Sequence, residues 1–237
     1  MIDRSLNYGR NIIELYLNMS TPYENVLDLG AGKGDDLHIA KKINDKARLF
    51  AIESYEPNIE CLQAKGIEVY SGDIEHSKFP FKDESIDIVI ANQFLEHTKE
   101  LFWVFHEISR VLRPKGKLIV GVPNLAALHN RLLLLFGRQP TPLKNNSAHI
   151  RGFTRSDFLR FLESCFPAGF SLSAFRGSNF YPFPPVFAKP LAKAFRNMAW
   201  GIFMLFEKTN SYNGQFLEYL TNNRLETNFR KSLPNQH

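Results

Sequence analysis

Short apolar runs alternate with longer segments of helical period between Asn25 and Asn124. The runs are rich in β-branched residues and fit five strands, at 25–29, 48–53, 67–70, 86–91 and 117–122. Between the runs, apolar residues recur three or four positions apart, most clearly over 100–112 before Arg113-Pro114-Lys115-Gly116 ends the pattern. This alternation predicts βαβ units and a parallel sheet.

The rhythm changes after Asn124, where longer loops separate the elements. Thr154 is a good N-cap for the second predicted helix, since Asp157 follows it in the first turn. The elements we expect here are a helix at 125–136, a polar loop at 137–152, a helix at 154–166, strands at 170–175 and 199–208, and a helix at 188–196. From Asn210 onward the chain is mostly polar, which predicts a surface helix and a frayed tail.

Two interpretations fit the aromatic and proline-rich stretch from Phe180 to Trp200. Its apolar side chains either pack on the sheet as an amphipathic connection, or form a lid over a hydrophobic substrate or a surface that rests on anionic lipid. Burial of the Phe side chains distinguishes the two. We therefore divide the chain into an N-terminal helical cap (1–24), a main domain (25–209) with a lid-like insertion at about 177–197, and a polar tail (210–237).

Composition narrows the class of protein. With 44% apolar and 22% charged residues, the 237-residue chain has the profile of a globular domain, and two cysteines are too few for a disulfide framework. The net charge of +5 comes entirely from residues 176–237, which carry eight basic and three acidic side chains, and this distribution argues against a nucleic-acid partner. The longest apolar run, 198–206, is far shorter than the ~20 residues of a membrane span, and we expect a cytoplasmic protein that is at most peripheral to a membrane.

A glycine-rich turn follows the first predicted strand, at Gly30, Gly32 and Gly34. Backbone amides at such a turn, beside a helix N-terminus, suit an anionic group. A dinucleotide fingerprint would need its third glycine at position 35, where this chain has Asp35, and no Walker lysine follows. The turn instead suits an amino-acid zwitterion, whose carboxylate meets the amides and whose cation meets Asp28.

Acidic residues also end the next two strands. Glu53 can bind both hydroxyls of a ribose, and Asp73 followed by Ile74 can bind an adenine amino group and pack on its ring. All three pieces fall at carboxyl ends of strands, where open α/β sheets place their ligands.

The chain at this point resembles the class I S-adenosylmethionine-dependent methyltransferases, in particular their small-molecule branch. The resemblance covers residues 25–124 and rests on Val26 to Gly34, Glu53, Asp73-Ile74, Phe79-Pro80-Phe81, Ser85 to Val89, Leu95-Glu96-His97 and Val111 to Leu118, with a later similarity at His149 to Thr154. It implies a Rossmann-like three-layer sandwich with a seven-stranded, mostly parallel sheet of order 3-2-1-4-5-7-6, in which strand 7 is antiparallel. The cofactor it implies is S-adenosyl-L-methionine, bound by Asp28, Gly30, Ala31, Gly32, Glu53, Ser54, Asp73, Ile74, Asn92 and Gln93.

The methyl acceptor is less constrained by the sequence. Asn92-Gln93-Phe94-Leu95 lacks the motif of nucleobase amine methyltransferases, so we expect a small molecule that accepts the methyl group on oxygen, with a hydrophobic or lipid-linked body as one option. His149 or His97 is the candidate general base, although each also suits a role in anchoring a loop, and we expect no metal site. An RNA methyltransferase and a catalytically silent cofactor-binding partner or sensor protein remain the alternatives.

Overall fold

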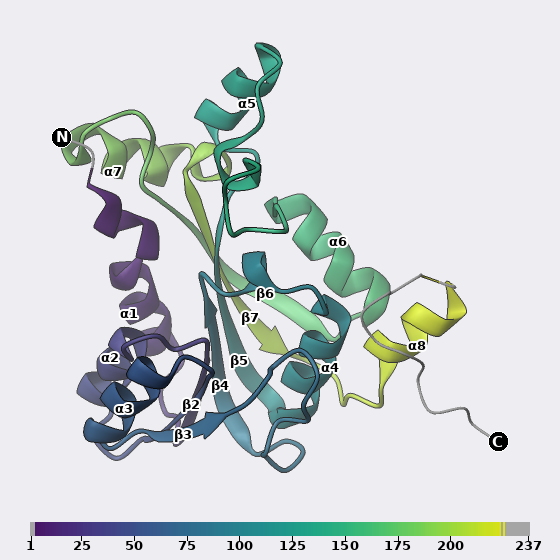
Figure 1. Ribbon diagram of the computed structural model, residues 1–237. Coiled ribbons are helices and arrows are strands. Elements are labelled where there is room, and N and C mark those ends of the chain that lie inside the picture. The colour runs from purple at the N-terminus through teal and green to yellow at the C-terminus, as the bar shows by residue number, and fades with distance from the viewer. Residues whose placement is uncertain (1–2, 224, 226–237) are drawn as a thin grey trace.

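A seven-stranded sheet runs through the computed structural model, which describes residues 3–223 and 225 (Figure 1). Its strands are β1 (Asn25–Leu29), β2 (Arg48–Glu53), β3 (Glu68–Ser71), β4 (Ile86–Asn92), β5 (Leu112–Pro123), β6 (Phe170–Ser178) and β7 (Gly201–Lys208). Their order is β3-β2-β1-β4-β5-β7-β6, and β7 pairs antiparallel with both of its neighbours. The predicted fold class and strand order are confirmed.

Helices cover both faces of this sheet, so that the molecule has three layers (Figure 1). The helices are α1 (Arg10–Met19), α2 (Asp35–Ile43), α3 (Glu56–Ala64), α4 (Leu101–Val111), α5 (Leu128–Leu135), α6 (Arg155–Cys165), α7 (Pro185–Ala194) and α8 (Gln215–Asn222). Short 3₁₀ turns occur at Arg4–Tyr8, Leu95–His97, Thr141–Leu143 and Arg196–Met198. One face carries α1, α2 and α3, and the other carries α4, α6 and α8. None of the described helices combines the length and apolar character needed to cross a membrane.

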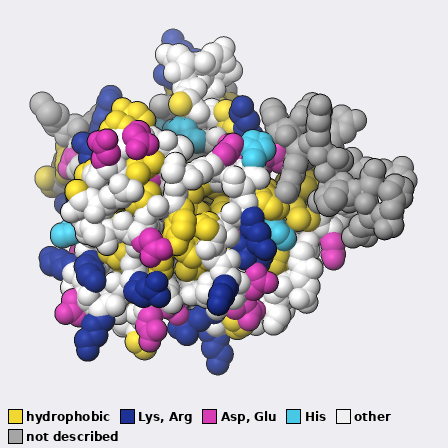
Figure 2. All heavy atoms as spheres, turned by 60° about the horizontal axis from the view of Figure 1, so that its bottom comes forward, with side chains coloured by type: hydrophobic (Ala, Val, Ile, Leu, Met, Phe, Trp, Pro, Cys, Tyr) yellow, Lys and Arg dark blue, Asp and Glu magenta, His cyan; other side chains and the backbone are white. Residues whose placement is uncertain are grey.

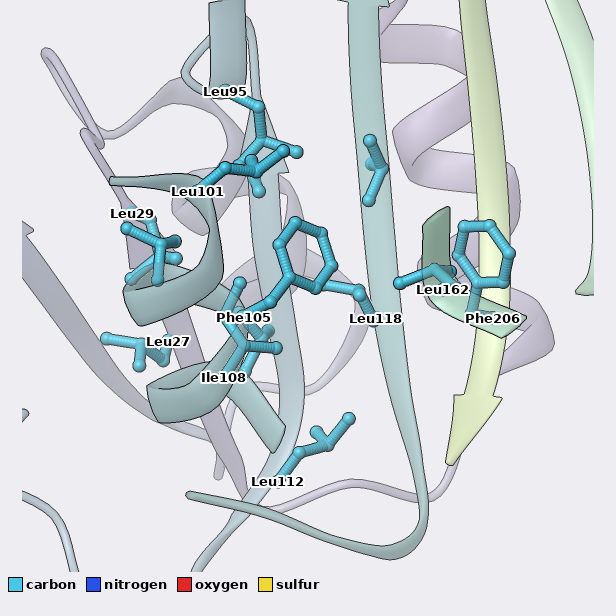
Figure 3. Close-up of a cluster of buried hydrophobic side chains, with 14 of the residues drawn as sticks. Leu27, Leu29, Leu95, Leu101, Phe105, Ile108, Leu112, Leu118, Leu162 and Phe206 are labelled. Atoms are coloured by element: carbon cyan, nitrogen blue, oxygen red, sulfur yellow. The ribbon is translucent and has the colours of Figure 1, made fainter. Parts of the chain in front are cut away.

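The larger hydrophobic core lies between the sheet and α4 (Figure 3). Leu27 of β1 and Leu118 of β5 lie on the same side of the sheet as Phe105 and Ile108 of α4, while Phe206 of β7 lies beside Leu162 of α6, and all six are buried. Alternate residues of the same strands pack on α1 and α2 at the opposite face. Strands buried on both faces explain why the run at 86–91 shows no polar alternation.

The fifth strand begins five residues before the sequence predicted. Leu112 already pairs with Ile86, and the register between β4 and β5 then shifts before Lys117 pairs with Ile88. Lys115 takes a positive φ of 64° within this irregular part. The chain therefore passes directly from α4 into β5. Leu112 has an extended backbone and pairs in the sheet, and the irregular pairing that follows it is a β-bulge.

Helix α5 begins at Leu128, three residues later than predicted. The side chain of Asn124 accepts a hydrogen bond from the Ala126 N–H at 3.0 Å and donates to the carbonyls of Asn197 and Ala199, both at 2.9 Å. These bonds hold the chain in a turn after β5 and delay the helix. The helix then projects from the body as a knob (Figures 1 and 2). The predicted N-cap of α6 is confirmed, because Thr154 Oγ1 accepts from the Asp157 N–H at 3.2 Å.

The stretch from Phe180 to Trp200 exposes most of its large apolar side chains. Phe180 is buried, but Phe187 is 58% exposed, Phe195 53% and Val186 78%. Helix α7 packs on the sheet edge mainly through the small residues Ala188 and Ala192. The exposed Phe side chains favour the interpretation as a lid or docking surface over that of a connection packed on the sheet. Of the predicted tail at 210–237, α8 is described, whereas residues 224 and 226–237 lie outside the described residues.

Candidate active site

The glycine turn leaves the carboxyl end of β1 in a left-handed conformation. Gly30 has φ 65°, and a Cβ atom there would lie 2.9 Å from the ring of Phe94. Gly32 has φ 56°, and a Cβ atom there would meet nothing within 4 Å. The backbone at Gly30 is therefore closely packed, while the backbone at Gly32 faces open space that a ligand can fill.

Glu53, at the end of β2, is bound to the glycine turn. Its Oε2 accepts a hydrogen bond from the Gly32 N–H at 2.9 Å, and its Oε1 accepts from the N–H groups of Ser54 at 2.9 Å and Tyr55 at 3.0 Å. Glu53 is nearly buried, at 8% exposure. Asn58 Nδ2 adds a longer bond to Oε2 at 3.4 Å, so these four donors fix the side chain in place at the end of β2.

A cavity of about 190 Å³ lies beyond the end of β3, with Asp73 and Ile74 in its wall. Ile52, Ile74 and Phe79 supply apolar surface to it. This volume is smaller than the ~300–1,000 Å³ of a typical whole-ligand pocket, so it suits a single ring system. The sequence-predicted residues for an adenine ring thus lie together around a space of suitable size and character.

Asp73 has a partner that the sequence did not indicate. Its Oδ2 lies 2.6 Å from Nδ1 of His76, and its Oδ1 accepts from the Glu75 N–H at 2.9 Å. Partial burial raises the pKa of Asp73, but the hydrogen bonds from His76 and Glu75 outweigh it, and the pKa lies below its usual value. Asp73 is therefore held as a carboxylate, which can accept a hydrogen bond from a ring amino group.

Asp28 and Asp36 form a buried acidic pair behind the glycine turn. Burial, followed by the charges of Asp36 and Glu53, raises the pKa of Asp28 well above its usual value. Burial also raises the pKa of Asp36, although a hydrogen bond from Asn92 and the charge of Arg10 oppose the rise. Buried acids that lie close together are costly to a fold, and their presence in a cleft indicates a site for a cationic ligand group.

Arg10, from α1, lies over this acidic pair. Its Nη2 is 2.6 Å from Asp35 Oδ2, and its Nε is 3.8 Å from Asp36 Oδ1. Its guanidinium also stacks on the ring of Tyr8, with 4.8 Å between Cζ and the ring centroid. The N-terminal helix thereby contributes a cation to the edge of the cleft, a role that the sequence did not indicate.

Asn92 and Gln93, at the end of β4, carry unpaired polar atoms. Asn92 Nδ2 donates to Asp36 Oδ2 at 2.7 Å and to the Tyr8 carbonyl at 3.0 Å, but its buried Oδ1 has no hydrogen-bond partner. Gln93 has a positive φ of 56°, and its buried Nε2 also lacks a partner. Such strain and unpaired groups collect at ligand sites, so Asn92 and Gln93 remain candidates for contact with a ligand.

The two candidate bases, His97 and His149, lie side by side. Their ring centroids are 4.7 Å apart, with the planes 78° from parallel. The Glu96 carbonyl accepts hydrogen bonds from the N–H groups of Ile150 at 2.9 Å and Arg151 at 3.2 Å, which holds the two loops together. Burial, and next the charge of His97, lowers the pKa of His149, so its imidazole is neutral at neutral pH.

A second, larger cavity of about 1240 Å³ opens beside α5 and the N-terminal segment. Its walls are mainly apolar and aromatic, and its cations are Arg4, Arg138 and Lys144, with no acidic side chain among the lining residues. Thr141 and Lys144 of its wall belong to the loop that also carries His149. We call this space the basic cavity. No feature of the sequence indicated it, because its lining comes from four separate segments.

Comparison with known proteins agrees with this geometry. Residues 27–120 match the family described as Methyltransferase domain. A probable S-adenosylmethionine-dependent methyltransferase of Mycolicibacterium smegmatis is 32% identical over 162 residues, which are 65% of this chain and 56% of that protein. A malonyl-[acyl-carrier protein] O-methyltransferase of Methylococcus capsulatus is 29% identical over 115 residues, which are 46% of this chain and 41% of that protein. The chain thus spans about half the length of these curated relatives.

Solved structures share the fold. A putative methyltransferase of Bacillus halodurans superposes with a TM-score of 0.59 at 20% sequence identity, covering 84% of this chain and all of that one. At this identity the likeness concerns the fold alone, while the sequence match over 27–120 concerns the family. Residues 27–120 therefore carry a methyltransferase domain, and the chain is similar in sequence and fold to S-adenosylmethionine-dependent methyltransferases.

Proposed function

We propose that this protein transfers a methyl group from S-adenosylmethionine to an oxygen atom of a small-molecule acceptor that has an apolar body and an acidic group. The hydrogen bond between Glu53 and the Gly32 N–H carries the proposal, because it fixes the acid and the glycine turn at one edge of the sheet. The cavity beside Asp73 lies at the end of β3, next to β2 in the sheet. When bound, S-adenosylmethionine supplies a methyl group already activated on its sulfonium.

Each part of the cofactor has a matching part of the cleft. Asp28 and the backbone of Gly30, Ala31 and Gly32 would hold the methionine end, since the buried acid suits its ammonium group. The ribose hydroxyls would bind Glu53 beside Ser54, and the adenine would enter the cavity lined by Asp73 and Ile74. Asn92 and Gln93 would lie beneath the sulfonium, where their unpaired side-chain atoms can meet the ligand.

The remaining task of the protein is to align the acceptor oxygen with the bond from sulfur to methyl carbon and to exclude water. Alignment of this kind is worth roughly 7–11 kcal/mol of a reaction barrier. His149 or its neighbour His97 would remove the proton from an acceptor hydroxyl, adding about 10²- to 10⁴-fold. The lowered pKa of His149 supports this role, since a base must be unprotonated to act.

The basic cavity supports an acidic, apolar acceptor. Leu132, Leu133 and Phe136 offer apolar surface, and the three cations without acidic neighbours favour a carboxylate or phosphate group. Thr141 and Lys144 of the cavity wall lie on the same loop as His149, which supports an acceptor that extends from the cavity towards the histidine pair. The relative from Methylococcus capsulatus is, by its name, an O-methyltransferase, which supports oxygen as the acceptor atom.

The exposed side chains around α5 and α7 support the proposal that this protein is cytoplasmic and contacts a membrane at its surface. We call this the apolar end; its exposed apolar side chains are Leu132, Leu134, Leu135, Phe136, Val186 and Phe187. Basic side chains lie among them on the same two segments, at Arg131, Arg138, Lys189 and Lys193. Apolar side chains beside basic ones are the combination that binds anionic lipid surfaces.

Calorimetric titration with S-adenosylhomocysteine, followed by an acceptor screen, tests the proposal. The screen would compare fatty acids, prenyl phosphates and phenols with their neutral analogues, and measure S-adenosylhomocysteine release. We expect the acidic amphiphiles to be preferred, and His149→Gln to lose about 10²-fold or more in turnover with cofactor affinity unchanged. Absence of cofactor binding would overturn the proposal. Binding without turnover on any acceptor would favour the silent partner, and turnover on RNA alone would favour the RNA methyltransferase.

A further inference from the structure

Three side chains that can bind metals converge where the loop carrying His149 meets the turn after β4. One ligand atom from each of Glu96, His97 and His149 lies within 4.8 Å of the other two. Around an ion held at the usual 2.0–2.2 Å, ligand atoms lie roughly 3.4 Å apart, so a small rotation of each side chain closes the group. The sequence did not indicate this cluster, since 51 residues separate its two histidines.

Glu96 is the strongest sign that the cluster has a ligand. The residue is 1% exposed, and both carboxylate oxygens are buried without a hydrogen-bond partner. Leaving a buried acid without any partner is costly, and a fold that keeps one commonly uses it. A cation would satisfy both oxygens at once.

The histidines are already oriented as metal ligands usually are. Nδ1 of His97 lies 3.2 Å from the Ala148 carbonyl, which leaves Nε2 free to bind. The His149 ring interacts with the Pro142 carbonyl, while its buried Nδ1 has no partner. In metal sites, the ring nitrogen that does not bind the ion typically donates to a backbone carbonyl or carboxylate, which fixes the tautomer and the ring.

Backbone bonds build the site before any ion enters. The Glu96 carbonyl holds the N–H groups of Ile150 and Arg151. Arg151 in turn donates from Nε to the Thr98 carbonyl at 2.8 Å and from Nη2 to the Lys99 carbonyl at 2.6 Å. His97 is exposed, so the buried acid can be reached from solvent along its ring. The cluster is thus both rigid and accessible.

From this geometry we infer that Glu96, His97 and His149 bind one divalent transition-metal ion. Two imidazoles and one carboxylate form the donor set of many sites for Zn²⁺ and for non-haem Fe²⁺, which leave further positions open for a substrate. Calcium and magnesium prefer oxygen ligands and fit this set poorly. This inference about the metal site rests on Glu96, His97 and His149 and does not depend on the proposed methyl transfer.

The catalytic use of the ion rests on the proposed function. Three protein ligands would leave coordination positions for an acceptor hydroxyl, and a Lewis acid lowers the pKa of a hydroxyl bound to it. With the ion bound, His97 and His149 would serve as metal ligands in place of the general-base role given above, and Glu96 would be the third ligand.

Metal titration of untagged protein, dialysed first against a chelator, tests the site directly. We expect one equivalent of Zn²⁺ to bind by calorimetry, and one equivalent of Co²⁺ to give the visible absorption of a coordinated ion. Glu96→Gln and His149→Asn each remove one ligand with little change in shape and should weaken Zn²⁺ binding at least tenfold. His38→Ala removes an exposed imidazole on α2 and should leave binding unchanged.

The readouts separate the metal site from the methyl-transfer reaction. Circular dichroism confirms that each variant is folded, and S-adenosylhomocysteine titration of the same samples reports the cofactor site. A wild-type protein that binds no Zn²⁺ or Co²⁺ would overturn the inference even if it binds cofactor, and so would variants that bind metal as tightly as the wild type. Metal binding without cofactor binding would leave the metal site standing and overturn the proposed function.

Discussion

The backbone N–H of Gly32 donates a hydrogen bond to the carboxylate of Glu53, with 2.9 Å between nitrogen and oxygen. This contact joins the ends of β1 and β2 before any ligand is present. The predicted methionine and ribose subsites are therefore linked by one hydrogen bond. A substitution at either residue should alter the geometry of both subsites.

Glu53→Gln should weaken S-adenosylhomocysteine binding about tenfold or more. An amide presents only one acceptor atom to donors that now use two oxygens, so either Gly32 or the pair Ser54 and Tyr55 loses its bond. Hydrogen bonds to a charged group contribute roughly 1.5–3 kcal/mol each. Calorimetric titration measures the loss.

Glu56→Gln is the matched control for that substitution. Glu56 lies three residues away in the first turn of α3, and its side chain is exposed. We expect its cofactor affinity to equal that of the wild type. Equal affinity in the Glu53 variant would contradict the ribose assignment.

Asp28→Asn should stabilise the folded protein at neutral pH and weaken its binding of the cofactor. Burial raises the folded-state pKa of Asp28, so the folded protein binds more protons than the unfolded chain between the two pKa values. The free energy of unfolding consequently falls as pH rises from the unfolded-state pKa to the folded-state pKa of Asp28. The Asn variant does not ionise, so it does not lose this part of the stability.

The same raised pKa gives cofactor binding a pH dependence. A cationic ammonium group needs ionised Asp28, so affinity should increase as pH rises and binding should release protons. Calorimetry in buffers of different ionisation enthalpy counts those protons, and urea unfolding across pH measures stability. Asp45→Asn, at an exposed acid, should change neither quantity. A wild type that releases no protons would contradict the role of Asp28.

Arg10→Gln should move the pH dependence of cofactor binding towards higher pH. The positive charge of Arg10 lowers the pKa values of both Asp28 and Asp36, so its removal makes both acids harder to ionise. The guanidinium is partly exposed, and we expect little effect on stability. Affinity measured against pH reports the shift, with Arg160→Gln on the exposed face of α6 as control. An unchanged dependence of affinity on pH would contradict a role of Arg10 at the cofactor site.

Local patterns predicted the strands and the candidate cofactor residues, whereas the order of the strands followed from the family resemblance. Strands buried on both faces leave apolar runs, and parallel strands bring residues such as Gly32, Glu53 and Asp73 to one edge whatever lies between them. Element ends were less accurate where tertiary bonds decide them, as with the Asn124 turn that delays α5.

Contacts between distant segments could not be predicted in this way. Arg10 meets Asp36 only because α1 packs on α2, and Glu96 meets His149 only because a loop returns to the end of β4. The basic cavity combines residues from four segments. No periodicity or motif encodes these meetings, since each depends on how whole elements pack.

The double substitution Leu135→Ser and Phe136→Ser should reduce binding to anionic vesicles about tenfold or more. These side chains at the end of α5 are 75% and 76% exposed, so inserting them into the lipid interface buries apolar surface worth roughly 1.5–3 kcal/mol for each full side chain. Their exposure also means that the fold loses little, within about 0.5 kcal/mol. Co-sedimentation with vesicles of anionic and of zwitterionic lipid measures the partition. Met19→Ser, at a 51% exposed residue of α1 away from the apolar end, should bind like the wild type. Because Arg131 and Lys189 contribute by charge, added salt should weaken binding of the wild type to anionic vesicles. Equal vesicle binding by the wild type and both variants would contradict the proposed contact of this protein with a membrane.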